Sequence, residues 1–280
     1  MAFYDRLLER LDGCAVPHRV VWGRKAPLVR FPGRRYLTYH THSEWPVAGQ
    51  LHLKLDYVTR YFTLDPMGYS GWSSLIGQDL VPDLAKGREV LAEYRDVGTK
   101  IAVEAQGAGP SERSIVVIGQ VFDDTVAVFH RDWVEVFQQA LVLGEILGCP
   151  VWYRPHPKDK GKLEAVASGF PGVLPFEGSF AECLSGHVLF VQNSGVGYEG
   201  LLSGAPLVAF GRSDYAFAAI DGARPVSEIA EAVAGWDPEA ALAAVGGMQV
   251  NRMCSTWSDA RFDAALQEIL RRHFGPDLIG

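Results

Sequence analysis

Short apolar runs alternate with amphipathic segments throughout the second half of the chain. Runs rich in β-branched and aromatic residues predict strands at 115–118, 150–153, 173–174, 188–191 and 206–210. Apolar residues at helical spacing predict helices over 131–148, 160–168, 179–185, 195–203, 226–234 and 258–273. Strands that alternate with helices in this way are typical of a parallel sheet covered on both faces, so the pattern predicts an α/β fold.

The first half of the chain has a less regular pattern. It predicts a helix over 2–12, strands near 18–22, 35–40 and 58–64, a loop over 65–71 and a helix over 82–97. The stretch 105–111, AQGAGPS, is rich in small residues, glycine and proline, and is the best candidate for a linker. We therefore predict a first domain over 1–107, a second over 108–257, and a C-terminal helix over 258–280 that packs back on the first domain.

Composition narrows the classes of function. The chain has 280 residues and a net charge of −7, which argues against general binding of nucleic acid because that needs a basic face. The four cysteines form no CxxC pair, so a structural zinc site or a disulfide framework is not expected. The N-terminus lacks an apolar signal region, and no apolar run reaches the length of a membrane span. These features predict a cytoplasmic protein.

Polar loops follow four of the predicted strands. They begin at Gly119, Arg154, Gln192 and Gly211. In open α/β sheets, ligands bind beyond the carboxyl ends of the strands, so the four loops are expected to form one binding rim. Asp123 and Asp124 in the first loop are candidates for sugar binding, and capping of the next helix is an equal alternative.

The segment NSGVGYE, residues 193–199, suits a phosphate. Ser194 and Gly195 let backbone N–H groups approach an anion at a helix N-terminus, where the helix dipole is positive. Glu199 lies about one turn into that helix, where its carboxylate could accept hydrogen bonds from a ribose diol. The alternative is an ordinary N-cap followed by a solvated glutamate.

The segment RPHP holds His156 between two prolines, beside Arg154. A guanidinium and a rigidly held imidazole both complement phosphate oxygens, which favours a functional role over a structural one. In the first half, Ser70 and Trp72 are candidates for sugar or acceptor contact, because tryptophan stacks on sugars; a core position is the alternative for Trp72.

These motifs, taken in order, resemble a known family. WGRK at 22–25, GQVFDD at 119–124, RPHP at 154–157, NSGVGYE at 193–199 and GAPLVAFG at 204–211 together resemble the bacterial capsule-polysaccharide biosynthesis proteins. Within that family they resemble the retaining Kdo transferases that use CMP-β-Kdo, which are related in fold to bacterial sialyltransferases. The resemblance is dense from about 115 to 216 and thin before it, and it is more specific for the superfamily than for the sugar.

The resemblance implies a GT-B fold, in which two Rossmann-like domains face a cleft and the nucleotide lies on the C-terminal one. The N-terminal domain of this chain is reduced. By motif match, His156 and Ser194 with Gly195 hold the donor phosphate, and Glu199 holds the ribose. Gln120 and Asn193 join them as predicted donor-binding residues, and we add Arg154 on physical grounds. The family's catalytic carboxylate falls nearest to Asp65, although DPMG at 65–68 departs from the family's Glu-Asp-Gly.

The predicted activity is transfer of a sugar, Kdo or a related ulosonic acid, from a CMP-sugar to a glycan or lipid-linked glycan acceptor. Asp65 and His156 are the predicted catalytic residues; whether Asp65 acts as a nucleophile or as a base stays open. We expect neither a metal ion nor a cofactor. We do expect peripheral association with a membrane assembly complex. The alternatives are a transferase for another nucleotide-sugar, a nucleotide-sugar epimerase or hydrolase, and a non-catalytic nucleotide-binding subunit of a capsule complex.

Overall fold

The computed structural model describes most of the second half of the chain and part of the first. The described ranges are 36–39, 50–55, 61–97, 112–184, 186–251 and 253–256, with Glu9, Asp12, Gly13 and Arg271. The expected strand at 18–22, the linker at 105–111 and nearly all of the expected helices at 2–12 and 258–273 lie outside these residues, as does the predicted division between residues 107 and 108.

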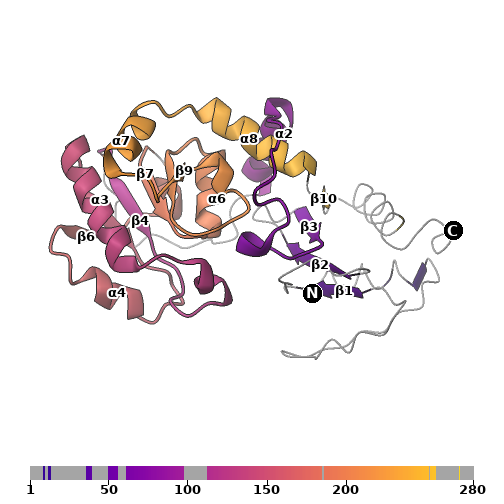
Figure 1. Ribbon diagram of the computed structural model, residues 1–280, viewed down its shortest axis with the longest axis horizontal. Coiled ribbons are helices and arrows are strands. Elements are labelled where there is room, and N and C mark those ends of the chain that lie inside the picture. Colours follow the sequence, from indigo (N-terminus) through magenta and orange to yellow (C-terminus); the bar gives the residue numbers. More distant parts are fainter. Residues whose placement is uncertain are drawn as a thin grey trace.

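A six-stranded parallel sheet organises the second half (Figure 1). Its strands are β4 (Ile115–Ile118), β5 (Val151–Arg154), β6 (Val173–Pro175), β7 (Val188–Val191), β8 (Leu207–Ala209) and β9 (Ile220–Asp221). They lie in the order β6-β5-β4-β7-β8-β9, and every neighbouring pair is parallel. This is the Rossmann order, which reverses direction between β4 and β7 and leaves a crevice at that point. The predicted α/β class is confirmed; β9 was not predicted.

Helices cover both faces of this sheet because successive strand residues point to opposite faces. Ile115, Val117 and Phe190 face a core completed by α3 (Trp133–Leu147), α4 (Lys162–Ala167) and α7 (Val226–Ala234). Val116, Ile118 and Leu189 face a second core, which holds residues of α2 (Leu84–Val97), α5 (Phe180–Cys183), α6 (Gly195–Leu202) and α8 (Pro238–Asn251). None of the described helices is long and apolar enough to cross a bilayer.

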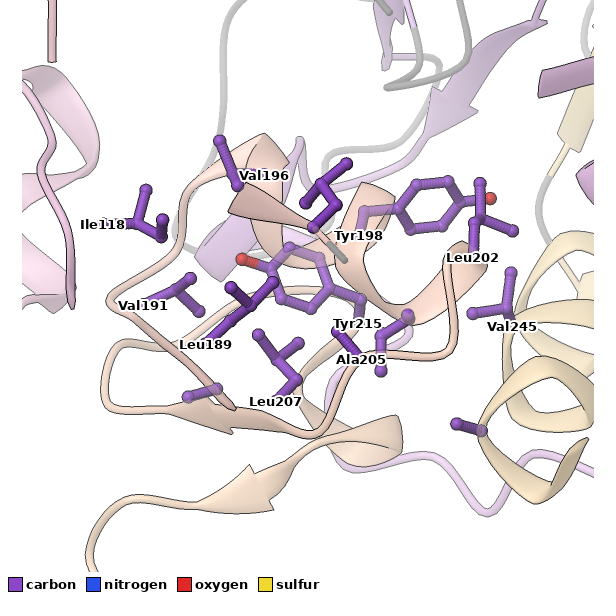
Figure 2. Close-up of a cluster of buried hydrophobic side chains, with 14 of the residues drawn as sticks. Ile118, Leu189, Val191, Val196, Tyr198, Leu202, Ala205, Leu207, Tyr215 and Val245 are labelled. Carbon is purple, nitrogen blue, oxygen red and sulfur yellow. The ribbon is translucent and has the colours of Figure 1, made fainter. Parts of the chain in front are cut away.

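The second core contains two fully buried tyrosines. Tyr198 on α6 and Tyr215 after β8 are both 0% exposed, and their rings pack among aliphatic side chains from the sheet and from α8 (Figure 2). The Tyr215 hydroxyl donates a hydrogen bond to the carbonyl of Ser194, at the start of α6. Burial of Tyr215 therefore fixes the end of α6 that the sequence assigns to phosphate binding.

A smaller mixed sheet forms the other part of the structure. It contains β1 (Tyr36–Tyr39), β2 (Gln50–Leu55), β3 (Tyr61–Asp65) and β10 (Met253–Thr256), in that spatial order. β1 and β2 are parallel, and the other two pairs are antiparallel. β2 was not predicted, and residues 253–256, which the sequence placed in the second domain, pair here with β3. The short 3-10 helices are η1 (Ser70–Trp72), η2 (Thr125–Phe129) and η3 (Ala216–Ala218).

Helices α2 and α8 lie alongside each other and join the two halves of the chain (Figure 1). Their backbones touch at glycines: a Cβ on Gly246 would lie 1.8 Å from the carbonyl oxygen of Asp83, and one on Gly87 would lie 2.2 Å from that of Leu242. The Asp83 N–H also donates to the carbonyl of Ala243 at 2.8 Å. The predicted helix at 82–97 is confirmed as α2, whereas α8 was not predicted.

Candidate functional site

A cavity of about 260 Å³ lies where the strand order reverses, beyond the ends of β4, β5 and β7. The structure brings most of the predicted site residues together on its wall: Ser70, Gln120, Asp124, Arg154, His156, Asn193, Ser194, Gly195 and Glu199. Asp65, Trp72 and Asp123 are not among the residues that line it. The location agrees with the general rule that open α/β sheets bind ligands at such a reversal.

Arg154 places a buried positive charge on the cavity wall. Only 8% of its surface is exposed, and its guanidinium lies 5.2 Å from the ring centroid of Phe180. The guanidinium makes no hydrogen bond or ion pair with any described residue, although it lines the cavity. A buried charge without a partner is costly, and an anion in the cavity would remove that cost. Arg154 therefore indicates an anionic ligand.

His156 presents a hydrogen-bond donor to the same cavity. Its Nδ1 accepts a hydrogen bond from the backbone N–H of Lys158 at 3.1 Å, so in the neutral ring the proton is on Nε2. Burial, and next the charge of Lys158, lowers the pKa of His156 below its ordinary value of 6.5. The ring is therefore neutral at pH 7, with Nε2–H as its donor.

The first turn of α6 lines the cavity with small residues, so a ligand can come close to its backbone. Ser194 caps the helix, because its side chain accepts a hydrogen bond from the N–H of Val196 at 3.3 Å. A Cβ on Gly197 would lie 2.6 Å from the hydroxyl oxygen of the buried Tyr215, so only glycine fits there. The Gly197 N–H donates to the carbonyl of Ser194 at 3.0 Å. The start of this turn carries the positive end of the helix dipole. Arg154 and His156 line the same cavity as this turn.

A glycine also holds the RPHP segment in place. A Cβ on Gly119, directly after β4, would lie 2.9 Å from the carbonyl oxygen of Arg154 and 2.9 Å from the nitrogen of His156. The Gly119 N–H donates to that same carbonyl at 2.8 Å. Asp159 fixes the other side, because its carboxylate accepts from the N–H groups of Phe122 at 3.0 Å and Leu163 at 2.6 Å. These contacts hold the loops after β4 and β5 together.

Asn193 and Gln120 hold the loops around the cavity together through side-chain hydrogen bonds. The side-chain Oδ1 of Asn193 accepts a hydrogen bond from Gln120 Nε2 at 2.6 Å and pairs with His130 Nε2 at 2.9 Å. The Nδ2 of Asn193 donates to the backbone carbonyl of Val126 at 3.0 Å. The Asn193 amide is therefore occupied in holding the neighbouring loops, even though the residue lines the cavity. His130 was missed by sequence reasoning, since no local pattern marks it.

Glu199 is buried, with 3% of its surface exposed, so the alternative of a solvated glutamate is wrong. Its Oε2 accepts a hydrogen bond from the hydroxyl of Tyr94 on α2 at 2.8 Å. Burial, and next the charge of Glu199, raises the pKa of Tyr94 well above its ordinary value, which keeps the hydroxyl protonated as a donor. A residue of the first half of the chain thus orients a carboxylate of the cavity wall.

The Tyr94 hydroxyl offers a direct test of the ribose assignment. Tyr94→Phe is expected to lower the preference for CMP over 2′-deoxy-CMP about 5-fold, because Glu199 loses the bond that orients it toward the ribose. Isothermal titration of both nucleotides measures this preference. The melting temperature and the affinity for 2′-deoxy-CMP are expected to stay close to those of the wild type; an unchanged preference would mean that Glu199 does not hold the 2′-hydroxyl.

Asp65 is bound by its own loop. Its carboxylate accepts hydrogen bonds from the N–H groups of Met67 and Gly68 at 2.7 and 2.9 Å, and from the Ser73 hydroxyl at 3.0 Å. The N–H and the hydroxyl of Ser74 also donate to it, each at 3.0 Å. This geometry favours Asp65 as the residue that shapes the loop after β3. Its role as catalytic carboxylate stays a prediction.

Two further predicted sugar-binding residues have other contacts. Asp123 is exposed and forms an ion pair with Lys162 at 2.8 Å, and this bond holds the pKa of the Asp123 carboxyl below its ordinary value. The Trp72 ring packs edge-on against Phe129, with ring centroids 4.6 Å apart. Of the two neighbouring acids in this loop, Asp124 is the one that lines the cavity.

Lys54 and Tyr69 line the cavity but were not predicted. Lys54 is on β2, with 9% of its surface exposed, and its Nζ lies 5.1 Å from the ring centroid of Tyr69. The signal was present in QLHLKL at 50–55, which alternates apolar and polar residues as a strand does. Within the described parts of the chain, no three His, Cys, Asp or Glu residues gather as metal ligands. The expectation of a metal-free site stays a prediction.

Stability is expected to fall as the pH falls below 6.5. Burial lowers the pKa of His130, His156 and His187 from that ordinary value, so each ring binds a proton more readily in the unfolded chain. The unfolded state then binds more protons between the folded and unfolded pKa values, and the free energy of unfolding decreases toward acid across that window. Urea titrations at pH 7.5, 6.5 and 5.5 measure the slope. A higher stability at pH 5.5 than at pH 7.5 would contradict the prediction.

Comparisons with known proteins come from structure alone. No protein-family model matches the chain, and no curated protein does. The solved "KpsC, beta Kdo 2,7 transferase" of Thermosulfurimonas dismutans is similar with a TM-score of 0.55 and 16% identity, over 97% of each chain. The "KpsC, beta Kdo 2,4 transferase" of the same organism has a TM-score of 0.44 and 18% identity, over 71% of this chain and 72% of that one.

A putative UDP-N-acetylglucosamine 2-epimerase from Listeria monocytogenes has a TM-score of 0.35 and 13% identity, over 71% of this chain and 55% of its own. At these identities a likeness shows the fold alone, and the beta Kdo 2,7 transferase aligns with a TM-score above 0.5. The chain therefore has the α/β, GT-B-like fold that its sequence predicts.

Proposed function

We propose that the protein is a glycosyltransferase that uses a nucleotide-sugar donor. The expected donor is a CMP-sugar carrying Kdo or a related ulosonic acid, and the expected acceptor is a glycan, free or lipid-linked, of a bacterial surface polysaccharide. The observation that carries the proposal is the buried guanidinium of Arg154, which has no anionic partner among the described residues, beside the Nε2–H of His156 and the N-terminus of α6. The likeness in fold to a solved beta Kdo transferase supports it.

The chemistry follows from where negative charge develops. When the anomeric bond breaks, the leaving nucleotide gains charge on its phosphate. Arg154, His156 and the first turn of α6 would stabilise that charge through donors that are already in place, which is a main source of rate enhancement in such reactions. Glu199, oriented by Tyr94, would hold the ribose hydroxyls.

Ligand binding provides the first experiment. Millimolar CMP is expected to raise the melting temperature more than UDP, GDP or ADP, because a ligand that binds the native state stabilises it. Incubation with CMP-Kdo, with and without a Kdo-terminated oligosaccharide, then tests turnover. Release of CMP that depends on the acceptor supports a transferase. If UDP stabilises the protein and CMP does not, the donor class is different.

The catalytic carboxylate is tested by a pair of variants. We expect Asp65→Asn to destabilise the protein by about 1–3 kcal/mol, because an amide cannot accept from all the donors that surround this carboxylate. Asp124→Asn, on the cavity wall, is expected to reduce turnover about 100-fold or more. Urea denaturation and CMP release measure the two effects. A stable Asp65→Asn variant with normal CMP binding and no turnover would instead make Asp65 the catalytic group.

A non-catalytic nucleotide-binding subunit is the second candidate. It is favoured by one observation: among the described residues that line the cavity, the only carboxylates are Asp124 and Glu199, and neither comes from the smaller sheet. This candidate predicts CMP binding of ordinary strength with no release of CMP from any donor. The turnover assay above separates it from a transferase.

A further inference from the structure

Ser70, in the loop after β3, lines the part of the cavity wall that comes from the first half of the chain. The nucleotide contacts of the proposed function come from the second half, because Arg154 and His156 lie at the end of β5 and Glu199 is on α6. We propose that the Ser70 hydroxyl forms a hydrogen bond with an oxygen of the sugar that the donor carries, and so distinguishes a nucleotide-sugar from the nucleotide alone. This inference rests on the proposed function and deepens it.

The hydroxyl of Ser70 is buried and forms no hydrogen bond with any described residue; 3% of the residue is exposed. A buried hydroxyl without a partner costs free energy, and most buried polar side-chain atoms in folded proteins do have a partner. Because Ser70 lines the cavity, an oxygen of a bound ligand would supply the missing partner. The residue therefore indicates a ligand that carries a hydrogen-bonding group at this wall.

The backbone of Ser70 is held in a costly conformation. Its φ is +52°, in the left-handed region, which a glycine adopts without strain and a serine does not. The Asp65 carboxylate imposes this conformation, because it accepts hydrogen bonds from the N–H of Gly68, before Ser70, and from the hydroxyl of Ser73, after it. The loop thus holds Ser70 in place before a ligand binds, which reduces the entropy lost on binding.

The same loop packs against the second half of the chain. Trp72 lies edge-on to the ring of Phe129 in η2, with ring centroids 4.6 Å apart. Gly71 lies so close to that ring that a Cβ would collide with it. Val126, also in η2, lines the cavity. Ser70 therefore lies where loops from the two halves of the chain meet at the cavity.

The sugar is the part of the donor that the nucleotide contacts leave without a partner. In the proposed function, Arg154, His156 and the first turn of α6 bind the phosphate, and Glu199 binds the ribose. The transferred sugar supplies the remaining hydroxyl, ring and carboxylate oxygens. A serine hydroxyl can both donate and accept, so it suits any of these oxygens. Since Ser70 is uncharged, we expect it to contribute a modest preference rather than most of the affinity.

The experiment compares each nucleotide with its nucleotide-sugar. Isothermal titration without acceptor measures the affinities for CMP and CMP-Kdo, and for UDP and UDP-N-acetylglucosamine. Ser70→Gly removes the hydroxyl and relieves the backbone strain, whereas Ser70→Ala removes the hydroxyl and keeps the strain. An effect shared by both variants therefore belongs to the hydroxyl. Ser168→Gly, at the end of α4 and outside the cavity, is the control for the loss of a serine side chain.

We expect Ser70→Gly and Ser70→Ala each to bind CMP-Kdo about 5-fold more weakly than the wild type and to bind CMP normally. Ser168→Gly is expected to bind both ligands as the wild type does. The proposal is overturned if the two Ser70 variants keep wild-type affinity for the nucleotide-sugar, or if only one of them loses it. An equal loss of affinity for the free nucleotide would also overturn it, since the contact would then be with the nucleotide.

Failure of the proposed function gives a different result. If the wild type binds UDP and not CMP, the donor class is different, and the UDP pair tests Ser70 by the same comparison. If CMP binding depends on Arg154 while the Ser70 variants bind CMP-Kdo normally, the proposed function stands and this inference fails. If the wild type binds neither nucleotide, both fail.

Discussion

Arg154→Met is expected to weaken CMP binding about 100-fold. The guanidinium is buried on the cavity wall and has no anionic partner among the described residues, so its interaction with a bound phosphate would be made in a poorly solvated site. Removal of one member of a buried charge pair costs roughly 2–5 kcal/mol of binding free energy. Methionine keeps the aliphatic stem against Phe180, so the fold is expected to remain intact. Isothermal titration with CMP measures the change.

The variant is also informative about stability. Because Arg154 has no anionic partner among the described residues, its burial carries a desolvation cost in the free protein. Arg154→Met is therefore expected to have an equal or higher melting temperature without ligand. Arg224→Met, at an exposed position before α7, is the control for loss of one arginine. Normal CMP affinity in Arg154→Met, together with a loss of stability, would make this arginine a structural residue and would remove the observation on which the proposed function depends.

Gly246→Val is expected to destabilise the protein by about 3 kcal/mol or more. A Cβ at this position would lie 1.8 Å from the carbonyl oxygen of Asp83 and 2.5 Å from the nitrogen of Gly87, so the clash is with backbone that cannot rotate away. Overpacking of a tight contact typically costs about 1–3 kcal/mol, and here the two helices must separate. Urea denaturation followed by circular dichroism measures the loss.

The control for this substitution is Ala240→Val, at an exposed position of the same helix, which carries only the lower helix propensity of valine. Because α2 also carries Tyr94, which holds Glu199, displacement of α2 is expected to reduce CMP affinity in Gly246→Val as well. A variant with the stability of Ala240→Val would show that α2 and α8 do not pack through their glycines.

Local sequence was sufficient for the strands and helices of the larger sheet. β4 and β7 lie over 115–118 and 188–191 as predicted, because a run of β-branched and aliphatic residues buried on both faces has few alternatives. The clustering of the binding loops was equally predictable. Parallel strands end at one edge of a sheet, so the loops after β4, β5 and β7 meet wherever those strands are neighbours.

Elements whose stability comes from distant partners were harder to predict. α8 is rich in alanine and glycine and has a weak apolar stripe, and its glycines allow it to pack closely against the backbone at the start of α2. β10 pairs with β3, from which it is separated by most of the chain. No local pattern specifies such a pairing, since its free energy comes from hydrogen bonds between segments that meet only in the folded state.

In the candidate site, too, some features follow from local sequence and others from tertiary packing. The sequence by itself predicted which residues of RPHP and NSGVGYE line the cavity, because each motif carries its hydrogen-bond donors within a few residues of one another. Only the tertiary structure decided that Tyr94 orients Glu199, that Lys54 faces the cavity, and that the Asp65 carboxylate is occupied by its own loop. The physical reason is that residue type alone fixes charge and hydrogen-bonding capacity. Burial and the identity of each hydrogen-bond partner depend on packing between segments that are distant along the chain.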